Sequence, residues 1–422
     1  MKAWEVKKLC EICQINPSKA EARKKLSATD LVSFIPMSNL GIQSKAIPLS
    51  ENKLLSEVVG SYTYFANNDV LLAKITPCFE NGKIGIARDL TNGIGFGSSE
   101  YIVFRSIGII EAEYLFYFLS QDSFRNSGAR LMTGAVGHKR VAKDFIENHP
   151  ILVPSLSEQK RIVSIVDEAF EAIDIAIDNT EQNLTNAREL FDSYLNAIFT
   201  QKGEGWKEKK LDEIGGKVST GPFGSLLHKS DYIFGGIPIV NPANIEENKI
   251  IPNFNKTISP DVAKRMHAYI LKENDVVVGR RGEIGRCAVV GEEEAGWLCG
   301  SGSFFINPFE NVNSIFLAHL IRSVPYRSKL EELASGATML NLSNQSLSDL
   351  IIAMPSIDEQ NQITDKLDDL KTETQRLESI YRQKLTALNE LKQSILHKAF
   401  TGELTADKAD LMTNIDREAI AV

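Results

Sequence analysis

Basic and amide side chains that could contact a nucleic acid lie on segments that we expect to form loops and turns. In the first part of the chain they are Lys74, Thr76, Lys83, His138, Lys139 and Arg140. Further along they are Arg280, Arg281, Arg286 and Asn341. Arginine offers a two-pronged donor to guanine, asparagine pairs with adenine and lysine contacts phosphate, so such loops suit base readout supported by backbone contacts. Charged loops are usually only solvated, and this composition alone does not establish DNA binding.

The sequence offers less support for catalysis than for nucleic-acid contacts. The phosphate-binding pattern Gly-x-x-x-x-Gly-Lys-Ser/Thr does not occur in the sequence. Asn307-Pro308-Phe309 lacks the second proline of the element with which amino-methyltransferases hold an exocyclic amine, so a turn beside a strand is the favoured interpretation. Cys10 and Cys13 have the spacing of half a zinc site, but no second Cys/His pair lies at finger spacing, and we expect both to be buried as small apolar side chains.

The elements that position these loops must belong to more than one domain, because 422 residues exceed the ~250–300 residues of a single hydrophobic core. No apolar stretch approaches the ~18 residues of a membrane helix, so we expect no membrane partner. The five cysteines lack disulfide spacing, which favours a reducing cytoplasm. A net charge of −8 does not argue against a nucleic-acid partner, because the acidity is concentrated in residues 151–201 and 355–422.

A tandem duplication organises the chain. Pro154 to Gln159 (PSLSEQ) returns as Pro355 to Gln360 (PSIDEQ), 201 residues later. Trp4 to Leu9 (WEVKKL) returns as Trp206 to Leu211 (WKEKKL), 202 residues later. Because the order of the repeated motifs is preserved, we expect two copies of one structural unit, at roughly 1–201 and 202–402.

Each copy is expected to end in a long helix. Residues 158–199 and 359–400 contain no glycine or proline, and apolar or small residues recur in them every three or four positions. This spacing is typical of a coiled-coil seam. Each helix is therefore predicted to bury one stripe against a partner helix.

The signals for the ends of these helices are also repeated. Ser155 with Glu158, and Ser356 with Glu359, have the spacing of a capping box, in which hydroxyl and carboxylate satisfy backbone donors at a helix start. Gly203 and Gly402 follow the two helices and are expected to adopt the left-handed conformation in which helices commonly end. The predicted helices thus have matching starts.

These patterns predict an α+β fold. It consists of two mixed α/β globules joined by two long helices that form an antiparallel coiled coil of roughly 60 Å, with pseudo-twofold symmetry. The predicted boundaries place the first globule at 1–154, its helix at 155–201, the second globule at 202–355, its helix at 356–404 and a tail at 405–422.

Several repeated elements carry a family resemblance. Gly336-Ala337-Thr338 precedes an apolar strand and the motif Pro355 to Gln360, and Gly134-Ala135 precedes the corresponding motif of the first copy. The Trp-x-x-x-x-Leu opening of each copy and Ala399 to Leu404 also match. In these features residues 1–404 resemble the DNA specificity subunit of type I restriction-modification systems. The first copy departs from the pattern, because valine follows Gly134-Ala135 where threonine is usual.

The resemblance implies that each globule is a target recognition domain that reads one half of a bipartite, asymmetric site on double-stranded DNA. It also implies that the helices set the spacing between the half-sites and dock two methyltransferase subunits, which restriction subunits join. The chain itself would be noncatalytic and hold no cofactor or metal. S-adenosylmethionine, ATP and magnesium would be bound by the partner subunits. By the same resemblance Asn244 and Thr338 join the candidate DNA-contacting residues.

Two other functions stay open on the sequence alone. The chain could be a coiled-coil scaffold whose globules bind proteins, in which case assembly with its partners would be insensitive to DNA sequence. A free-standing methyltransferase or nuclease is disfavoured by the missing cofactor motifs. Binding of S-adenosylmethionine by the purified chain would support that enzymatic function.

Overall fold

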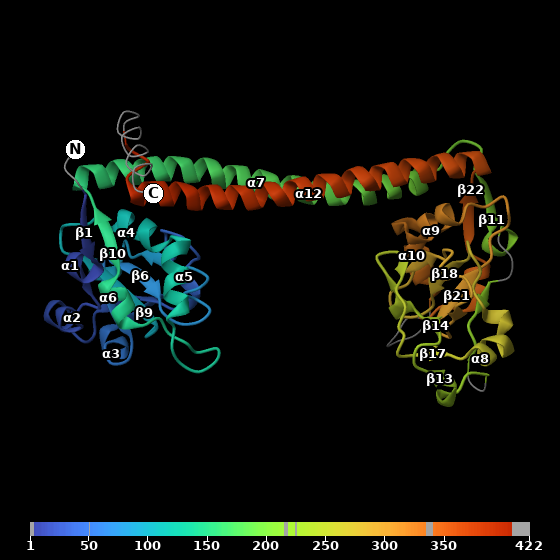
Figure 1. Ribbon diagram of the computed structural model, residues 1–422, viewed down its shortest axis with the longest axis horizontal. Coiled ribbons are helices and arrows are strands. Elements are labelled where there is room, and N and C mark those ends of the chain that lie inside the picture. The colour runs from blue at the N-terminus through green and yellow to red at the C-terminus, as the bar shows by residue number, and fades with distance from the viewer. Residues whose placement is uncertain (1–3, 50, 215–217, 224–225, 335–340, 407–422) are drawn as a thin grey trace, which may run out of the picture. The chain divides into compact units, whose positions relative to one another are not determined.

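The computed structural model describes residues 4–49, 51–214, 218–223, 226–334 and 341–406. They form two compact units (Figure 1). The first unit comprises Met1–Thr180 and Gln383–Val422, and the second comprises Glu181–Arg382. The long helices α7 (Leu156–Gln201) and α12 (Ile357–Thr401) each contribute one segment to each unit. The predicted five-segment division of the chain stays a prediction, because the compact units divide within the helices.

Two four-stranded sheets form the globular part of the first unit. The first sheet is antiparallel throughout, with the order β2 (Cys13–Ile15), β9 (Tyr101–Ser106), β6 (Val70–Ala73), β7 (Ile84–Ile86). The second has the order β4 (Glu51–Leu54), β3 (Leu31–Ile35), β8 (Ile94–Gly97), β5 (Thr63–Ala66). Its central pair, β3 and β8, is parallel. The shorter helices are α1 (Leu9–Ile12), α2 (Ala20–Lys25), α3 (Leu55–Val58), α4 (Ala112–Leu119), α5 (Asp122–Arg130) and α6 (Lys143–Asn148).

The second unit repeats the antiparallel sheet, whereas its other sheet has a different strand order. Its antiparallel sheet has the order β12 (Ser219–Thr220), β21 (Ser303–Ile306), β18 (Val276–Gly279), β19 (Cys287–Val289). The other sheet has the order β13 (Tyr232–Ile233), β17 (Thr257–Ile258), β14 (Ile237–Val240), β20 (Leu298–Cys299), again with one parallel pair, β14 and β20. A hairpin joins β15 (Ile245–Glu246) to β16 (Lys249–Ile250). The helices are α8 (Pro260–Arg265), α9 (Ser314–Arg322), α10 (Val324–Leu333) and α11 (Asn344–Ser348).

An antiparallel strand pair closes each globule and explains why the two repeated motifs lie at its sequence ends. In the first unit β1 (Glu5–Lys8) pairs with β10 (Pro150–Val153). In the second unit β11 (Lys207–Lys210) pairs with β22 (Ile351–Met354). The opening strand of each copy therefore lies beside the strand that leads into the long helix. Together with the matching antiparallel sheets, this pairing confirms the α+β class and the tandem duplication predicted from the sequence.

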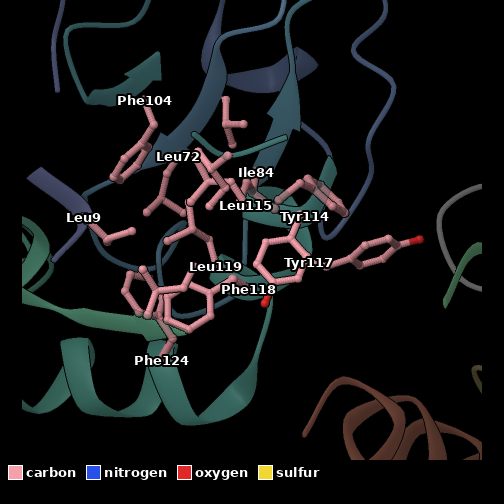
Figure 2. Packing of buried hydrophobic residues seen from close by; sticks show 14 of the residues in the cluster. Leu9, Leu72, Ile84, Phe104, Tyr114, Leu115, Tyr117, Phe118, Leu119 and Phe124 are labelled. Atoms are coloured by element: carbon pink, nitrogen blue, oxygen red, sulfur yellow. The ribbon is translucent and has the colours of Figure 1, made fainter. Parts of the chain in front are cut away.

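The core of the first unit lies between its antiparallel sheet and the long helices. Figure 2 shows Leu115 of α4 beside Leu72 and Ile84 of the sheet. On another side of α4, the ring of Tyr114 lies 4.8 Å from that of Phe400 of α12. Every residue from 114 to 119 is buried, because α4 has sheet on one side and helix on the other. In the second unit α9 occupies the position equivalent to that of α4. Its buried residues belong to the same hydrophobic cluster as residues of β18, α7 and α12.

Within each unit the segments of α7 and α12 run antiparallel. In the first unit Lys392 of α12 forms an ion pair with Asp174 of α7. In the second unit Arg188 of α7 contacts Glu378 of α12 at 3.4 Å, and Phe199 shares a core cluster with Leu367. Residue numbers thus rise along one helix as they fall along the other, as the predicted antiparallel coiled coil requires. In the described part of the chain, no helix is both long and apolar enough to span a membrane.

A buried glutamine fastens each long helix to its globule. The amide nitrogen of Gln159 donates to the carbonyl oxygens of Ile109 at 3.0 Å and Pro154 at 2.9 Å, and its amide oxygen accepts from the N–H of Glu111 at 2.8 Å. Its side chain is fully buried. Because Ile109 and Glu111 lead into α4, these three bonds join the start of α7 to the helix that covers the sheet.

Gln360 makes the same three contacts in the second unit. It donates to Asn311 at 3.4 Å and Pro355 at 3.1 Å and accepts from the N–H of Asn313 at 2.9 Å. The adjacent serines cap the helices, since the hydroxyl of Ser356 accepts from the N–H of Glu359 at 3.3 Å. The repeated Glu-Gln of the sequence is therefore explained by packing and hydrogen bonding of the helix start.

Gly402 has the left-handed conformation predicted for it, with φ of 85°, but Gly203 does not. Lys202, with φ of 50°, is the left-handed residue after α7. A Cβ on Gly203 would lie 2.5 Å from Nε1 of Trp206 and 2.8 Å from Oε1 of Glu359. Since the indole N–H of Trp206 donates to that carboxylate at 2.8 Å, the glycine is needed for this close approach rather than for its backbone freedom.

Replacing Gln360 with methionine tests the helix attachment. The change keeps the side-chain length but leaves two carbonyl oxygens and one N–H without partners, so we expect the second unit to lose about 3 kcal/mol of unfolding free energy. Urea denaturation of the full chain measures the loss. Gln362→Met is the matched control, because Gln362 lies on the same helix and is exposed. Equal stability of the two variants would contradict the assignment.

His319 is a buried base at the junction of α9 with α7. Its side chain is 5% exposed, its ring lies 6.0 Å from that of Phe191, and its Nδ1 lies 3.2 Å from Nη2 of Arg322. Burial, followed by the charges of Arg322 and Lys371, lowers the pKa of His319 to about 3. The imidazole therefore stays neutral in the folded unit at pH values where it is protonated in the unfolded chain.

This difference predicts a stability that falls as the pH falls. Between pH 6.5 and about 3 the unfolded chain binds a proton on His319 that the folded unit does not, so each pH unit costs about 1.4 kcal/mol. We expect His319→Gln to remove this dependence. Urea denaturation at pH 7.5 and 5.5 should show the stability of the wild type decreasing relative to the variant by about 1.4 kcal/mol. A constant difference between the two proteins would refute the neutral buried imidazole.

Candidate nucleic-acid interface

In the first unit, the end of β6 lies beside the segment that follows α5. Ile75 and Arg140 form an isolated β-bridge, and the N–H of Thr76 donates to the carbonyl of Lys139 at 2.9 Å. The N–H of Val141 donates to the carbonyl of Lys74 at 2.9 Å. These backbone bonds bring two loops that are more than sixty residues apart in the sequence to the same place.

The segment after α5 forms an exposed loop held at its base. Thr133 and Arg140 exchange backbone hydrogen bonds of 3.0 and 2.8 Å, and all residues between them are exposed. This loop, in teal, extends from the globular part of the first unit in Figure 1. Gly134 and Gly137 have φ of 129° and 80°, which residues with a Cβ rarely adopt. The turn between them leaves the side chain of Val136 94% exposed.

The charged side chains of this face are unequally available. Arg140 donates to both carboxylate oxygens of Glu100, at 2.9 and 2.7 Å, and this bonding lowers the pKa of Glu100. Lys74 donates to the carbonyl of Ser99 at 2.8 Å. In contrast, the described residues provide no hydrogen-bond or ion-pair partner for the side chains of His138 and Lys139. The outer loop thus presents a cation to solvent while the arginine at its base is neutralised.

The second unit brings the equivalent segments together. Arg281, just after β18, forms an isolated β-bridge with Asn341, which corresponds to the bridge between Ile75 and Arg140. The N–H of Leu342 donates to the carbonyl of Arg280 at 3.1 Å. Of the residues predicted from the sequence, Arg280, Arg281 and Asn341 therefore lie at one site. Thr338 lies outside the described residues.

Arg280 is held in a fixed orientation at this site. Its Nε donates to the carbonyl of Leu342 at 3.0 Å, and its guanidinium carbon lies 5.3 Å from the ring centre of Phe223 and 5.8 Å from that of Phe304. Burial, and then the charge of Arg281, lower the pKa of Arg280. The terminal nitrogens of Arg280 have no partner within the described ranges, which leaves its donor fork available.

Two further candidates are connected to the 241–244 turn of the second unit. Asn244 bonds within its own turn, accepting from the N–H of Asn241 at 3.1 Å and donating to Ile251 at 3.0 Å. Arg286 donates to the carbonyl of Pro242 at 3.3 Å and pairs with Glu283. Both side chains are thus largely occupied by contacts within the unit.

Lys83 lies beside the end of β6, where its carbonyl accepts from the N–H of Ala73 at 3.0 Å, but its side chain is bonded elsewhere. Its ammonium donates to the carbonyl of Met37 at 2.9 Å, and its backbone bridges to Ile42. The structure therefore gathers Lys74, Thr76 and the 138–140 segment, whereas the ammonium of Lys83 bonds to a different loop. Lys83 instead connects two loops of the globule.

The residues considered for catalysis have structural contacts. Asn307 donates a hydrogen bond to the carboxylate of Asp275, next to β18. Cys13 is buried and burial raises its pKa to about 12, whereas Cys10 is exposed, so the expectation of two buried thiols was wrong for Cys10 because it lies on the outer side of α1. Among the residues that the structure describes, no group of three or more His, Cys, Asp or Glu side chains is placed to hold a metal ion.

The sequence interpretation missed two residues of these sites. Glu100 was not singled out, because its pairing with Arg140 depends on a contact across forty positions of the chain. Phe223 was missed because an isolated aromatic residue in a Gly-Pro-Phe-Gly segment carries no periodic signal. Its half-exposed ring beside Arg280 becomes apparent only when the sheet has placed the two segments together.

Comparison with known proteins identifies the duplicated unit. The family model described as the type I restriction modification DNA specificity domain matches residues 1–186 and again residues 203–387. The specificity subunit of the type I restriction enzyme EcoAI of Escherichia coli is 36% identical over 199 residues, which are 46% of this chain and 33% of that protein. That of EcoEI, also from Escherichia coli, is 32% identical over 220 residues, or 51% of this chain and 35% of that protein. The matched part thus spans about a third of the length of each of these relatives.

Solved structures share the fold over nearly the whole chain. The HsdS subunit from Thermoanaerobacter tengcongensis covers 96% of this chain and 98% of its own, with a TM-score of 0.68 and 19% identity. A chain from a study of complex assembly and conformational transition of the type I R-M system covers 96% and 99%, with a TM-score of 0.73 and 20% identity. Because the domain model matches both copies of the duplication and most of the sequence, this chain belongs to the type I restriction modification DNA specificity family.

Proposed function

We propose that this chain is the sequence-specific DNA-recognition subunit of a type I restriction-modification complex, in which each globule reads one half of a bipartite, asymmetric site. One observation carries the proposal beyond family membership. In both units a β-bridge joins the segment after an inner strand of the antiparallel sheet (β6 or β18) to the segment before the last short helix (α6 or α11). These bridges link Ile75 to Arg140 and Arg281 to Asn341. Each site presents basic side chains for phosphate and base contacts.

The two sites differ in chemistry, which supports an asymmetric target. In the first unit the guanidinium of Arg140 is paired with Glu100, and Lys139 is exposed on a flanking loop. In the second unit the guanidinium of Arg280 has no acidic partner among the described residues. Donor groups of different geometry recognise different base edges, so the half-sites should not be copies of each other.

Assembly with partner proteins is the second part of the proposal. We assign to the two helices the docking of two methyltransferase subunits, with restriction subunits joining the complex. Exposed acidic side chains such as Glu168, Glu171 and Asp178 on α7 suit a protein partner better than phosphate. In this proposal the chain is noncatalytic and works in the cytoplasm, and S-adenosylmethionine, ATP and magnesium bind to the partner subunits.

The coiled-coil scaffold is the weaker alternative. A scaffold would explain the paired helices, but it would not explain why both globules match a DNA specificity domain. The scaffold function also provides no role for equivalent basic sites in two globules whose sequences differ widely. We therefore favour DNA recognition.

Selection from randomised double-stranded oligonucleotides tests the proposal. The full chain, assembled with its methyltransferase subunits, should enrich one split motif with two different halves and a fixed spacer. Affinity should decrease steeply with salt, because contacts to phosphates release counterions. Enrichment of no motif by a soluble complex, or binding that does not change with salt, would contradict DNA recognition.

The exposed loop of the first unit predicts a phosphate contact by Lys139. Lys139→Ala should weaken binding to all duplexes by a similar factor and reduce the slope of log K against log salt by about 0.9, the value of one lost phosphate contact. Fluorescence anisotropy at several salt concentrations measures both quantities. Lys143→Ala is the matched control, because Lys143 is exposed nearby but pairs with Glu147 at 3.2 Å on α6. An unchanged slope for Lys139→Ala would remove this loop from the interface.

A further inference from the structure

The segment that carries Phe223 is fixed tightly against the antiparallel sheet of the second unit. Just before it, β12 pairs with β21, and the N–H of Gly221 donates to the carbonyl of Ser303 at 3.3 Å. A Cβ on Gly221 would lie 2.2 Å from the carbonyl oxygen of Cys299, so only glycine permits this approach. The following ring is thereby placed over the guanidinium of Arg280.

Phe223 and Phe304 both lie within cation–π distance of the Arg280 guanidinium but differ in exposure. Phe304 is fully buried in the sheet, whereas the side chain of Phe223 is 50% exposed. With Nε of Arg280 bonded to Leu342, the two cation–π contacts and the hydrogen bond together hold the guanidinium. The entropy of ordering a long side chain is thus already lost before any ligand binds, which favours a two-bond contact.

We propose that Phe223 is a positioning and specificity-determining residue, which orients the fork of Arg280 for bidentate contact with O6 and N7 of a guanine in the half-site read by the second unit. This inference rests on the proposed function and adds to it the base recognised. The two terminal nitrogens would donate to the two acceptors of the guanine edge, the commonest specific contact in the major groove. The exposed part of the Phe223 ring would then lie against a neighbouring base.

A base edge fits this site better than a phosphate. Phosphate oxygens are strongly hydrated, and an exposed aromatic ring beside the fork gains nothing from contact with them. The same ring gains stacking or apolar contact beside a base or a thymine methyl group. Arg281, which is exposed next to Arg280, is available for the phosphate contact.

The first unit does not have this arrangement. Lys74 occupies the position after β6 that Arg280 occupies after β18, and it is a point charge bonded to Ser99 rather than a planar fork. The guanidinium of Arg140 at this site is already paired with both oxygens of Glu100. The guanine contact is therefore assigned to the second half-site alone.

Two conservative variants test the inference in the assembled complex of the full chain. Phe223→Leu removes the ring but keeps an apolar side chain, and Arg280→Lys removes the fork but keeps the charge. Matched controls are Phe309→Leu, at a ring that is 48% exposed elsewhere in the second unit, and Arg265→Lys, at an arginine paired with Asp231 at 3.1 Å. The probe is a library of randomised duplexes, with enrichment scored by sequencing.

The wild type should select a motif that contains one guanine. At that position both test variants should lose at least ~10-fold of the enrichment of guanine over the other bases. The base preferences at the other positions, and those of both control variants, should be unchanged. A uniform loss of affinity with unchanged base preferences would overturn the guanine assignment in favour of phosphate. Unchanged selection by Phe223→Leu alone would overturn the positioning role. If the wild type itself selected no motif, the proposed function would fail instead, and the two failures are thus distinguishable.

Discussion

The attachment of each long helix through a buried glutamine is the interaction on which the rest of the structure depends. Gln159 and Gln360 each satisfy three backbone groups in the segments that lead into α7 and α4, or into α12 and α9. A hydrogen-bonded side chain without access to water has one geometry, because any rotation leaves buried groups unpaired. Each long helix (α7 or α12) is therefore positioned together with the helix that covers the sheet (α4 or α9). The sheet that carries the candidate site is positioned with them.

On this common frame the two copies have acquired different surfaces. Asp69 and Asp275, which precede β6 and β18, are both buried, but the first is paired with Arg105 and the second with Asn307. The same divergence occurs at the end of the strand, where lysine in one copy corresponds to arginine in the other. A frame that tolerates such exchanges allows each globule to change what it binds without changing how it is held.

The sequence predicted the long helices and the duplication well, but it predicted the candidate DNA-contacting sites only in part. Repeated motifs, uninterrupted apolar periodicity and serine caps were sufficient for the helices and the duplication, because these are local signals of known period. Sheet order, the pairing of Arg140 with Glu100 and the stacking of Phe223 on Arg280 depend on contacts between distant segments, for which no local pattern exists. Gly203 shows why local patterns are insufficient. A glycine is required there because Trp206 and Glu359 pack beside it, and not because it ends a helix.

The most direct test of the central claim is to map the bases that the assembled complex modifies. The full chain would be co-expressed with its methyltransferase subunit in a host without DNA methylation, and modified adenines would be located by single-molecule sequencing. Our account predicts methylation at one split, asymmetric motif, and only when this chain is present. Methylation at the same positions without the chain, or at a palindromic site, would contradict the assignment of two different half-sites to its two globules.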